Sequence, residues 1–271
     1  MDWSLIVASN NEGILKNCLA ASPCAGTARD FQVMRGFASA GTAYNAGMCK
    51  ASGDILVFVH HDVYLPEGWG EQLAGAVTRL SQSDPNWGVL GVWGIALDLK
   101  ARGFIYCTGL QRVLGNMFVD PIACTSLDEV VLVLRRSIGL RFDERLPGYH
   151  LYGTDICLTA KQRGMNSYVI PAFCIHNTAG LTFLPWTFWQ THFYMRRKWR
   201  KLLPIRTPCT VISKWGMPFV DHPLRSAYVR YVKGELAGQR VEDVASLYRR
   251  LVDDGWVPHS VPTGAQIRRV I

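Results

Sequence analysis

The chain has 271 residues, of which 49% are hydrophobic and 18% are charged, and its formal net charge is +8. This composition supports a sizeable core and excludes an intrinsically disordered protein. The apolar runs, such as 55–59, are far shorter than the roughly 20 residues that cross a bilayer, so the sequence predicts no transmembrane helix.

Eight cysteines are scattered along the chain, and no CxxC pair occurs. This usage predicts reduced cysteines and a cytoplasmic protein. The first residues, "MDWSLIVASNNEG", carry no basic segment and no small-residue cleavage site, so a secretory signal is not expected. A peripheral position at the inner membrane face stays open, because the chain is basic.

Strands and helices alternate in the first part of the chain. Short apolar runs predict strands, and apolar residues at helical spacing predict helices. Alternation of this kind predicts a parallel sheet that is covered on both faces. The predicted strands are 3–9, 30–36 and 54–59, and the predicted helices are 10–22, 41–53 and 68–83.

The middle of the chain is richer in strands, and the end is richer in helices. We expect the helix in 149–164 to begin at Thr154 or Asp155. The helix from Trp186 carries aromatic residues at i, i+3 and i+7 and ends in a dense basic run, so we expect the aromatic face to pack in the core. The remaining predicted strands are 87–97, 103–110, 129–136 and a pair in 166–180, and the last predicted helix is 241–255.

Polar side chains follow many of these apolar elements. A mainly parallel sheet gathers its strand ends into one cleft, where ligands bind. No GxGxxG follows the first strand and no GxxxxGK[ST] occurs, which disfavours a Rossmann dinucleotide site and a P-loop. The polar groups are Asn10-Asn11-Glu12, Tyr44-Asn45, His60-His61-Asp62, Asp128-Glu129, Asp155 and His176.

Four blocks resemble family 2 glycosyltransferases with the GT-A fold, in the bacterial glycosyltransferase family 2-like branch. The blocks are "SLIVASNNE", "AYNAGMCKASGDILVFVHHDVYLPEGW", "DEVVLVLRRSIGLRFDE" and "YHLYGTDICLTAKQRGMNSYVIPAFCIHN". The resemblance implies an α/β nucleotide-diphospho-sugar transferase fold, with a mostly parallel central sheet and flanking helices. We expect this domain in residues 1–206 and a C-terminal helical extension in 207–271.

The resemblance also implies an activity. We expect a metal-dependent enzyme of the hexosyltransferase type that moves a sugar from a nucleotide-diphosphate donor, with UDP as the expected nucleotide, to an acceptor hydroxyl with inversion. The family's Asp-x-Asp motif is replaced by His60-His61-Asp62. Asp62, His176 and His60 are the expected ligands of a divalent cation, Mn²⁺ or Mg²⁺, and the imidazoles favour Mn²⁺.

The implied site residues follow from the matched blocks. Asp155 is the expected catalytic base, because the resemblance places it at the start of the base helix, where Thr154 stands in place of a common glutamate. Tyr44 stands where many members have arginine. The expected donor-binding residues are Ser9, Asn10, Glu12, Tyr44, Asn45, His60, His61, Asp62 and Asp128.

Other interpretations stay open from the sequence. Asp155 could only cap its helix, and His60-His61 could be a solvated turn. The chain could be a retaining enzyme, or an inert module that binds nucleotide-sugars. A nucleic-acid protein would fit the positive charge, but no nucleic-acid motif is present. The sequence does not choose among saccharide, lipid-linked and small-molecule acceptors.

Overall fold

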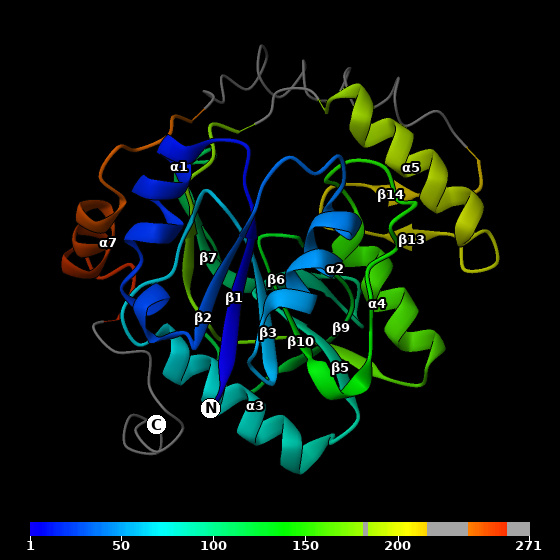
Figure 1. Cartoon of the computed structure of the whole chain (residues 1–271), viewed down its shortest axis with the longest axis horizontal. Helices are drawn as coiled ribbons and strands as arrows, with labels where there is room; N and C mark the ends of the chain where they lie inside the picture. The colour runs from blue at the N-terminus through cyan, green and yellow to red at the C-terminus, as the bar shows by residue number, and fades with distance from the viewer. Residues whose placement is uncertain (181–183, 216–237, 259–271) are drawn as a thin grey trace.

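A mixed, curled sheet runs through the computed structural model, which describes residues 1–180, 184–215 and 238–258 (Figure 1). The strand order is β2-β1-β3-β10-β5-β11-β9-β6-β7-β12-β4, and β8 pairs with β7. The strands are β1 (Trp3–Ala8), β2 (Asp30–Met34), β3 (Ile55–His60), β4 (Val63–Tyr64), β5 (Trp87–Gly91), β6 (Trp93–Ala96), β7 (Ala101–Cys107), β8 (Arg112–Gly115), β9 (Ile122–Leu127), β10 (Val131–Arg135), β11 (Asn166–Val169) and β12 (Cys174–His176).

The predicted α/β fold is confirmed, but the sheet is mixed rather than mostly parallel. Strand β1 pairs in parallel with β2 and β3, as the alternation predicted. Strand β10 then enters antiparallel between β3 and β5. Strand β10 follows β9 along the chain without a helix, and β5 and β11 lie between the two strands in the sheet. The alternation of strands and helices thus predicted the strand directions correctly for β1, β2 and β3 but not for β10.

Helices cover both faces of this sheet (Figure 1). Most predicted boundaries agree within a few residues, but α2 ends at Lys50 rather than Gly53, and α4 begins at Tyr152, ahead of the predicted start. The helices are α1 (Glu12–Asn17), α2 (Ala40–Lys50), α3 (Trp69–Ser83), α4 (Tyr152–Gln162), α5 (Trp186–Lys198) and α7 (Val244–Asp253), with 3₁₀ turns at Leu19–Ala21, Pro23–Thr27 and Arg136–Ile138 and a hairpin of β13 (Ile205–Arg206) and β14 (Val211–Ile212).

Alternate residues of the central strands serve two separate cores, because successive side chains point to opposite faces of a sheet. On β1, Leu5 and Val7 pack in the core that also holds α1 and α3. Ile6 packs in the core that holds α2, α4 and α5. Helix α2 lies so close to β1 that a Cβ at Gly47 would come within 2.5 Å of Ile6 Cγ2. This close packing fixes where α2 presents its side chains to the site.

The aromatic face predicted for α5 is only partly correct. Trp189 is buried as expected, but Trp186 is 64% exposed. Phe188 and Met195 are buried in its place. The spacing predicted one stripe of aromatic residues, whereas the helix packs through a stripe that is rotated by about one residue.

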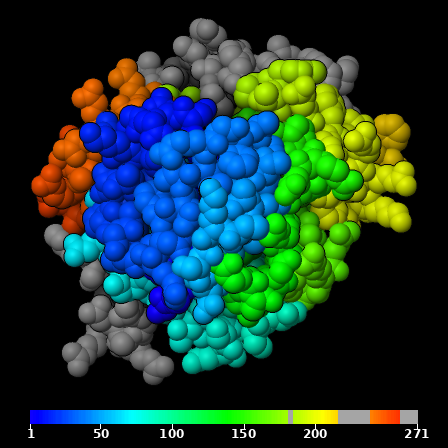
Figure 2. Space-filling view, viewed as in Figure 1, coloured from blue at the N-terminus to red at the C-terminus, as the bar shows by residue number. Residues whose placement is uncertain are grey.

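Helix α7 confirms the predicted C-terminal helix and packs on the N-terminal half of the chain. Val244, Leu247 and Leu251 share a core with Cys18 and Phe173. Figure 2 shows α7, in orange and red, at the left edge beside the blue N-terminal segment. The division at residue 206 stays a prediction, and 216–237 and 259–271 of the predicted extension lie outside the described residues. Among the helices that the structure describes, none is long and apolar enough to cross a membrane.

Candidate active site

A pocket of about 380 Å³ opens where β1 and β3 end. Because these two strands are parallel neighbours, the residues that follow them meet at one edge of the sheet. The pocket is lined by Ala8, Ser9, Asn10, Gly36, Phe37, Tyr44, His60, His61, Asp62, Tyr149 and His150. The sequence predicted six of these residues as donor ligands, namely Ser9, Asn10, Tyr44, His60, His61 and Asp62.

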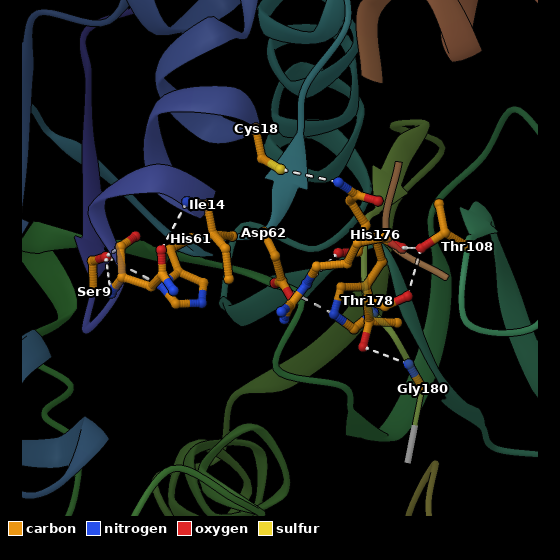
Figure 3. A network of polar contacts seen from close by, with 12 residues as sticks. Ser9, Ile14, Cys18, His61, Asp62, Thr108, His176, Thr178 and Gly180 are labelled. Carbon is orange, nitrogen blue, oxygen red and sulfur yellow. Dashed lines mark hydrogen bonds and ion pairs between the residues drawn. The ribbon is translucent and has the colours of Figure 1, made fainter. Parts of the chain in front are cut away.

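At one side of the pocket, His60, Asp62 and His176 form a cluster whose ligand atoms all lie within 4.8 Å of one another. Pairing of β12 with β4 sets His176 opposite Val63. Nε2 of His176 consequently lies 3.5 Å from Oδ1 of Asp62. In Figure 3, Asp62 lies between His61 and His176. The structure thus brings together the three metal ligands that the sequence predicted.

The protonation states in this cluster suit a cation. Burial lowers the pKa of His60 to about 4, so its imidazole is neutral at physiological pH. Burial opposes ionisation of Asp62, but the neighbouring His176 holds the Asp62 pKa well below its usual range. In turn, burial opposes protonation of His176, whereas Asp62 raises its pKa. The group therefore offers the Asp62 carboxylate and the neutral His60 imidazole, and His176 adds a second imidazole once a bound cation displaces its proton.

This donor set fits a divalent transition metal. Ligand atoms about 2.0–2.2 Å from a shared ion lie within roughly 4.4 Å of one another, close to the spacing seen here. Imidazole nitrogen with carboxylate oxygen suits Mn²⁺ better than Mg²⁺, which prefers oxygen alone. The guanidinium of Arg240 already places a positive charge at the cluster, since its Nη2 is 3.3 Å from Oδ2 of Asp62.

Tyr152, at the start of α4, holds the His60 ring. Its hydroxyl lies 2.9 Å from Nε2 of His60 and 3.4 Å from the hydroxyl of Tyr44. The preceding residue, Leu151, is buried with a φ of 58°, a strained value for leucine. That turn starts α4 early and directs Tyr152 to the site. Sequence reasoning missed Tyr152, although it adjoins the predicted base helix.

On the opposite side of the pocket, Ser9 and His61 are paired. The Ser9 hydroxyl lies 3.1 Å from Nδ1 of His61 (Figure 3). Tyr149 donates a hydrogen bond to the carbonyl oxygen of Phe37 at 2.9 Å, which closes another wall of the pocket. Phe37 and Tyr149 were not predicted, because both lie in loops that no periodicity marks.

Two predicted donor residues point elsewhere. Glu12 is exposed and accepts two hydrogen bonds from the guanidinium of Arg35, which holds the Glu12 pKa below its usual value. Asn45 is buried and bonds both the amide nitrogen and the carbonyl oxygen of Phe142. Neither residue lines the described pocket. Asn45 instead fastens the loop before α4 to α2.

The carboxylate predicted as catalytic base is enclosed. Asp155 is only 2% exposed. Nζ of Lys198 lies 2.7 and 2.8 Å from its two oxygens, and Trp199 Nε1 donates to Oδ1 at 2.7 Å. Both oxygens are therefore occupied, and the structure does not place Asp155 among the pocket residues. Its position within α4 also corrects the alternative that it caps the helix.

Asp128 and Glu129 form a half-buried acidic pair behind the cluster. Burial raises the pKa of both carboxyl groups, and the proximity of Asp128 adds to the effect on Glu129. Oε1 of Glu129 accepts a hydrogen bond from Gly153 N at 3.2 Å, and the Glu129 carbonyl oxygen accepts one from Tyr152 at 3.4 Å. Neither Asp128, a predicted donor ligand, nor Glu129 lines the described pocket, and Glu129 lies behind it, beside Tyr152.

The curled mixed sheet with helices on both faces is the GT-A fold. A family model described as "Glycosyltransferase like family" matches residues 4–194, and the chain belongs to this family. A curated protein from Fuscovulum blasticum, "ATP synthase subunits region ORF 6", is 30% identical over 164 residues. That match covers 58% of this chain and 64% of the relative, so the chain spans less than two thirds of its length.

Solved structures of glycosyltransferases are similar in fold. GalNAc-T7 with UDP, GalNAc and Mn²⁺ is 12% identical, with a TM-score of 0.50 over 93% of this chain and 57% of that one. The mannosyltransferase PcManGT from Pyrobaculum calidifontis, in complex with GDP-Man and Mn²⁺, is 12% identical, with a TM-score of 0.45 over 98% and 78%. At this level of identity the likeness to GalNAc-T7 supports the fold.

Proposed function

We propose that the chain transfers a sugar from a nucleotide-diphosphate donor to an acceptor hydroxyl. The observation that carries this proposal is the cluster of His60, Asp62 and His176 at the side of a pocket large enough for part of a nucleotide. A structural role alone does not account for two imidazoles and a carboxylate that converge beside an open pocket.

The residues in and beside the pocket would have separate roles. His60, Asp62 and His176 would hold a divalent cation, which neutralises the charge that develops on the leaving diphosphate. Tyr152 fixes the ring of His60, as partners of metal-bound histidines do. Asn10 and the aromatic ring of Tyr44 would contact the nucleoside.

For the base that takes the acceptor proton, we propose Glu129 in place of Asp155. A base needs a free oxygen within reach of the hydroxyl, and Asp155 has none. Glu129 lies next to Tyr152 and Gly153 at the start of α4. Its raised pKa makes it a stronger base than an ordinary carboxylate once it is ionised.

We further propose Mn²⁺ as the metal, UDP as the nucleotide and inversion at the anomeric carbon. The imidazole ligands support Mn²⁺. The structure of GalNAc-T7 with UDP, GalNAc and Mn²⁺ is consistent with Mn²⁺ and with UDP. Inversion rests on the family resemblance, and anomeric NMR of the product distinguishes it from retention.

Calorimetry tests the donor site. UDP, GDP and dTDP are titrated in the presence of Mn²⁺, Mg²⁺ or EDTA into the unaltered chain and into Asp62→Ala. We expect one nucleotide to bind only with metal, and this binding to be lost in Asp62→Ala. Binding that survives EDTA would contradict metal dependence, and the absence of binding to every nucleotide would overturn the donor site.

The surface at the basic end of α5 is suited to an anionic membrane, and we propose peripheral contact there. Trp186 and Trp215 are exposed by 64% and 77%. Arg196, Arg200 and Lys201 line an open hollow next to Trp215. Exposed tryptophans with outward cations are typical of interfacial binding. Sedimentation with anionic and neutral vesicles checks this, and equal binding to both would contradict it.

A further inference from the structure

Arg240 brings a positive charge to the carboxylate at the centre of the site. Its Nη2 lies 3.3 Å from Oδ2 of Asp62, and its Nε donates to the carbonyl oxygen of Asn177 at 3.1 Å. The opposite oxygen of Asp62 faces His176. Arg240 comes from the segment before α7, nearly 180 residues beyond Asp62, and no sequence pattern linked the two.

The backbone on both sides holds Arg240 in this place. The Asn177 side chain pairs with Val241, since its Oδ1 accepts from Val241 N and its Nδ2 donates to Val241 O, each at 2.8 Å. Gly238 N donates to Gly109 O at 3.1 Å. A Cβ at Gly238 would come within 2.0 Å of the Thr108 carbonyl oxygen, so only glycine allows this approach. The guanidinium is thus delivered by a fastened segment, while its side chain stays 41% exposed.

This position gives Arg240 two opposing effects. Asp62 is the one carboxylate of the described cluster, and a guanidinium on its oxygen opposes a second cation at the same group. A diphosphate would bring several negative oxygens to the neighbourhood of Asp62. Arginine binds phosphate oxygens through charge-assisted hydrogen bonds, often two at a time. The guanidinium therefore has a better partner when a donor is present than when it is absent.

We propose that Arg240 is a donor-contact residue that exchanges partners. It holds Asp62 when the site is empty of donor and contacts the diphosphate when nucleotide and cation are bound together. This inference rests on the proposed function. It makes metal binding and nucleotide binding favour each other. The metal alone must compete with Arg240 for Asp62, and the nucleotide alone must compete with Asp62 for Arg240.

The test compares Arg240→Met with Arg249→Met. Arg249 is an exposed arginine of α7 whose guanidinium contacts Ser246, so its replacement removes the same charge without touching Asp62. Free Mn²⁺ is followed by electron paramagnetic resonance as it is titrated into each protein without nucleotide. Calorimetry with Mn²⁺ then measures UDP and GDP beside UMP and GMP, and thermal unfolding checks that each variant is folded.

We expect Arg240→Met to bind Mn²⁺ alone a few times more tightly, and the preferred nucleoside diphosphate roughly tenfold more weakly, than the unaltered chain. Affinity for the monophosphate should stay closer to that of the unaltered chain, and Arg249→Met should behave as the unaltered chain. If the unaltered chain binds Mn²⁺ and diphosphate but Arg240→Met shows the same affinities, the inference is wrong and the proposed function stands. If the unaltered chain binds neither ligand, the proposed function fails and the inference fails with it.

Discussion

The hydroxyl of Tyr152 lies 2.9 Å from Nε2 of His60, so the first turn of α4 holds a ring that belongs to β3. Tyr152→Phe removes that hydroxyl and leaves the His60 ring free to rotate. We expect the affinity for Mn²⁺ to fall about tenfold, as it does when other partners of metal-bound histidines are removed. The free energy of unfolding should fall by only about 1 kcal/mol. Mn²⁺ titration and urea unfolding measure the two effects.

Tyr149→Phe is the matched control for this prediction. Tyr149 lines the same pocket and also loses one hydroxyl hydrogen bond, but its partner is the carbonyl oxygen of Phe37. Its affinity for Mn²⁺ should equal that of the unaltered chain. An equal loss of Mn²⁺ binding in both variants would mean that Tyr152 supports the pocket in general rather than the His60 ring.

The metal cluster could be predicted from the sequence because its ligands follow recognisable strands. His60 and Asp62 end the apolar run of β3, and His176 ends the run of β12. A sheet brings such ends together whatever the distance along the chain. The resemblance added the expectation that these ends face a donor. Local apolar patterns and the family blocks were sufficient to bring these three side chains together in one prediction.

The environment of Asp155 could not be predicted, because it depends on contacts between distant segments. Lys198 lies 43 residues further along the chain, within the dense basic run at the end of α5. Nothing in that run distinguishes the one lysine that turns inward. The positive φ of Leu151 also starts α4 earlier than its cap signals predicted, which brings Tyr152 rather than Asp155 into contact with His60. Backbone strain of this kind leaves no mark in residue periodicity.

The choice of base predicts different results for two conservative variants. Glu129→Gln should lower turnover at least about 100-fold, since a positioned base contributes that much or more. Its affinity for nucleotide should be unchanged. Because burial raises the Glu129 pKa, turnover of the unaltered chain should increase as the pH rises above neutral. Turnover and calorimetry, measured on the same preparations over a range of pH, separate these effects.

Asp155→Asn is the comparison for that prediction. It keeps the size of the side chain but removes the charge that Lys198 and Trp199 contact. We expect the variant to be less stable by about 2 kcal/mol, because Lys198 loses one of its two carboxylate partners, and to retain most of its turnover. If Asp155→Asn abolishes turnover in a folded protein while Glu129→Gln stays active, Asp155 is the base after all.

Glu12 provides a negative prediction at the edge of the site. Its carboxylate is exposed and occupied by Arg35, so Glu12→Gln should leave nucleotide affinity within about twofold of the unaltered chain. Asn10 lies two residues earlier and lines the pocket, so Asn10→Ala should weaken nucleotide affinity more than Glu12→Gln does. Calorimetry with the preferred nucleotide compares them. A larger loss of nucleotide affinity in Glu12→Gln than in Asn10→Ala would show that Glu12 contacts the donor.

Lys198 joins the half-buried carboxylate of Asp143 to the buried carboxylate of Asp155, and its loss should have a pH-dependent cost. Nζ contacts Asp143 at 2.8 Å and Asp155 at 2.7 Å. Lys198→Met removes the cation from both carboxylates, and we expect the free energy of unfolding to fall by about 2–4 kcal/mol at pH 7, chiefly through Asp155. Lys201→Met removes an exposed lysine from the same basic run and should change stability by less than about 0.5 kcal/mol.

The difference between the unaltered chain and Lys198→Met should shrink in acid. Burial opposes ionisation of Asp143, but its hydrogen bond to Lys198 lowers its pKa from 3.8 to about 2. A lowered pKa stabilises the fold above the ordinary value, and this contribution is lost as the pH falls from 3.8 toward 2. Burial already raises the Asp155 pKa, and removing Lys198 should raise it further. The variant therefore loses most stability at neutral pH, where both Asp143 and Asp155 must be ionised. Urea unfolding at pH 7, 5 and 3 measures the difference. A difference that does not change with pH would show that Lys198 stabilises through its methylene packing rather than its charge.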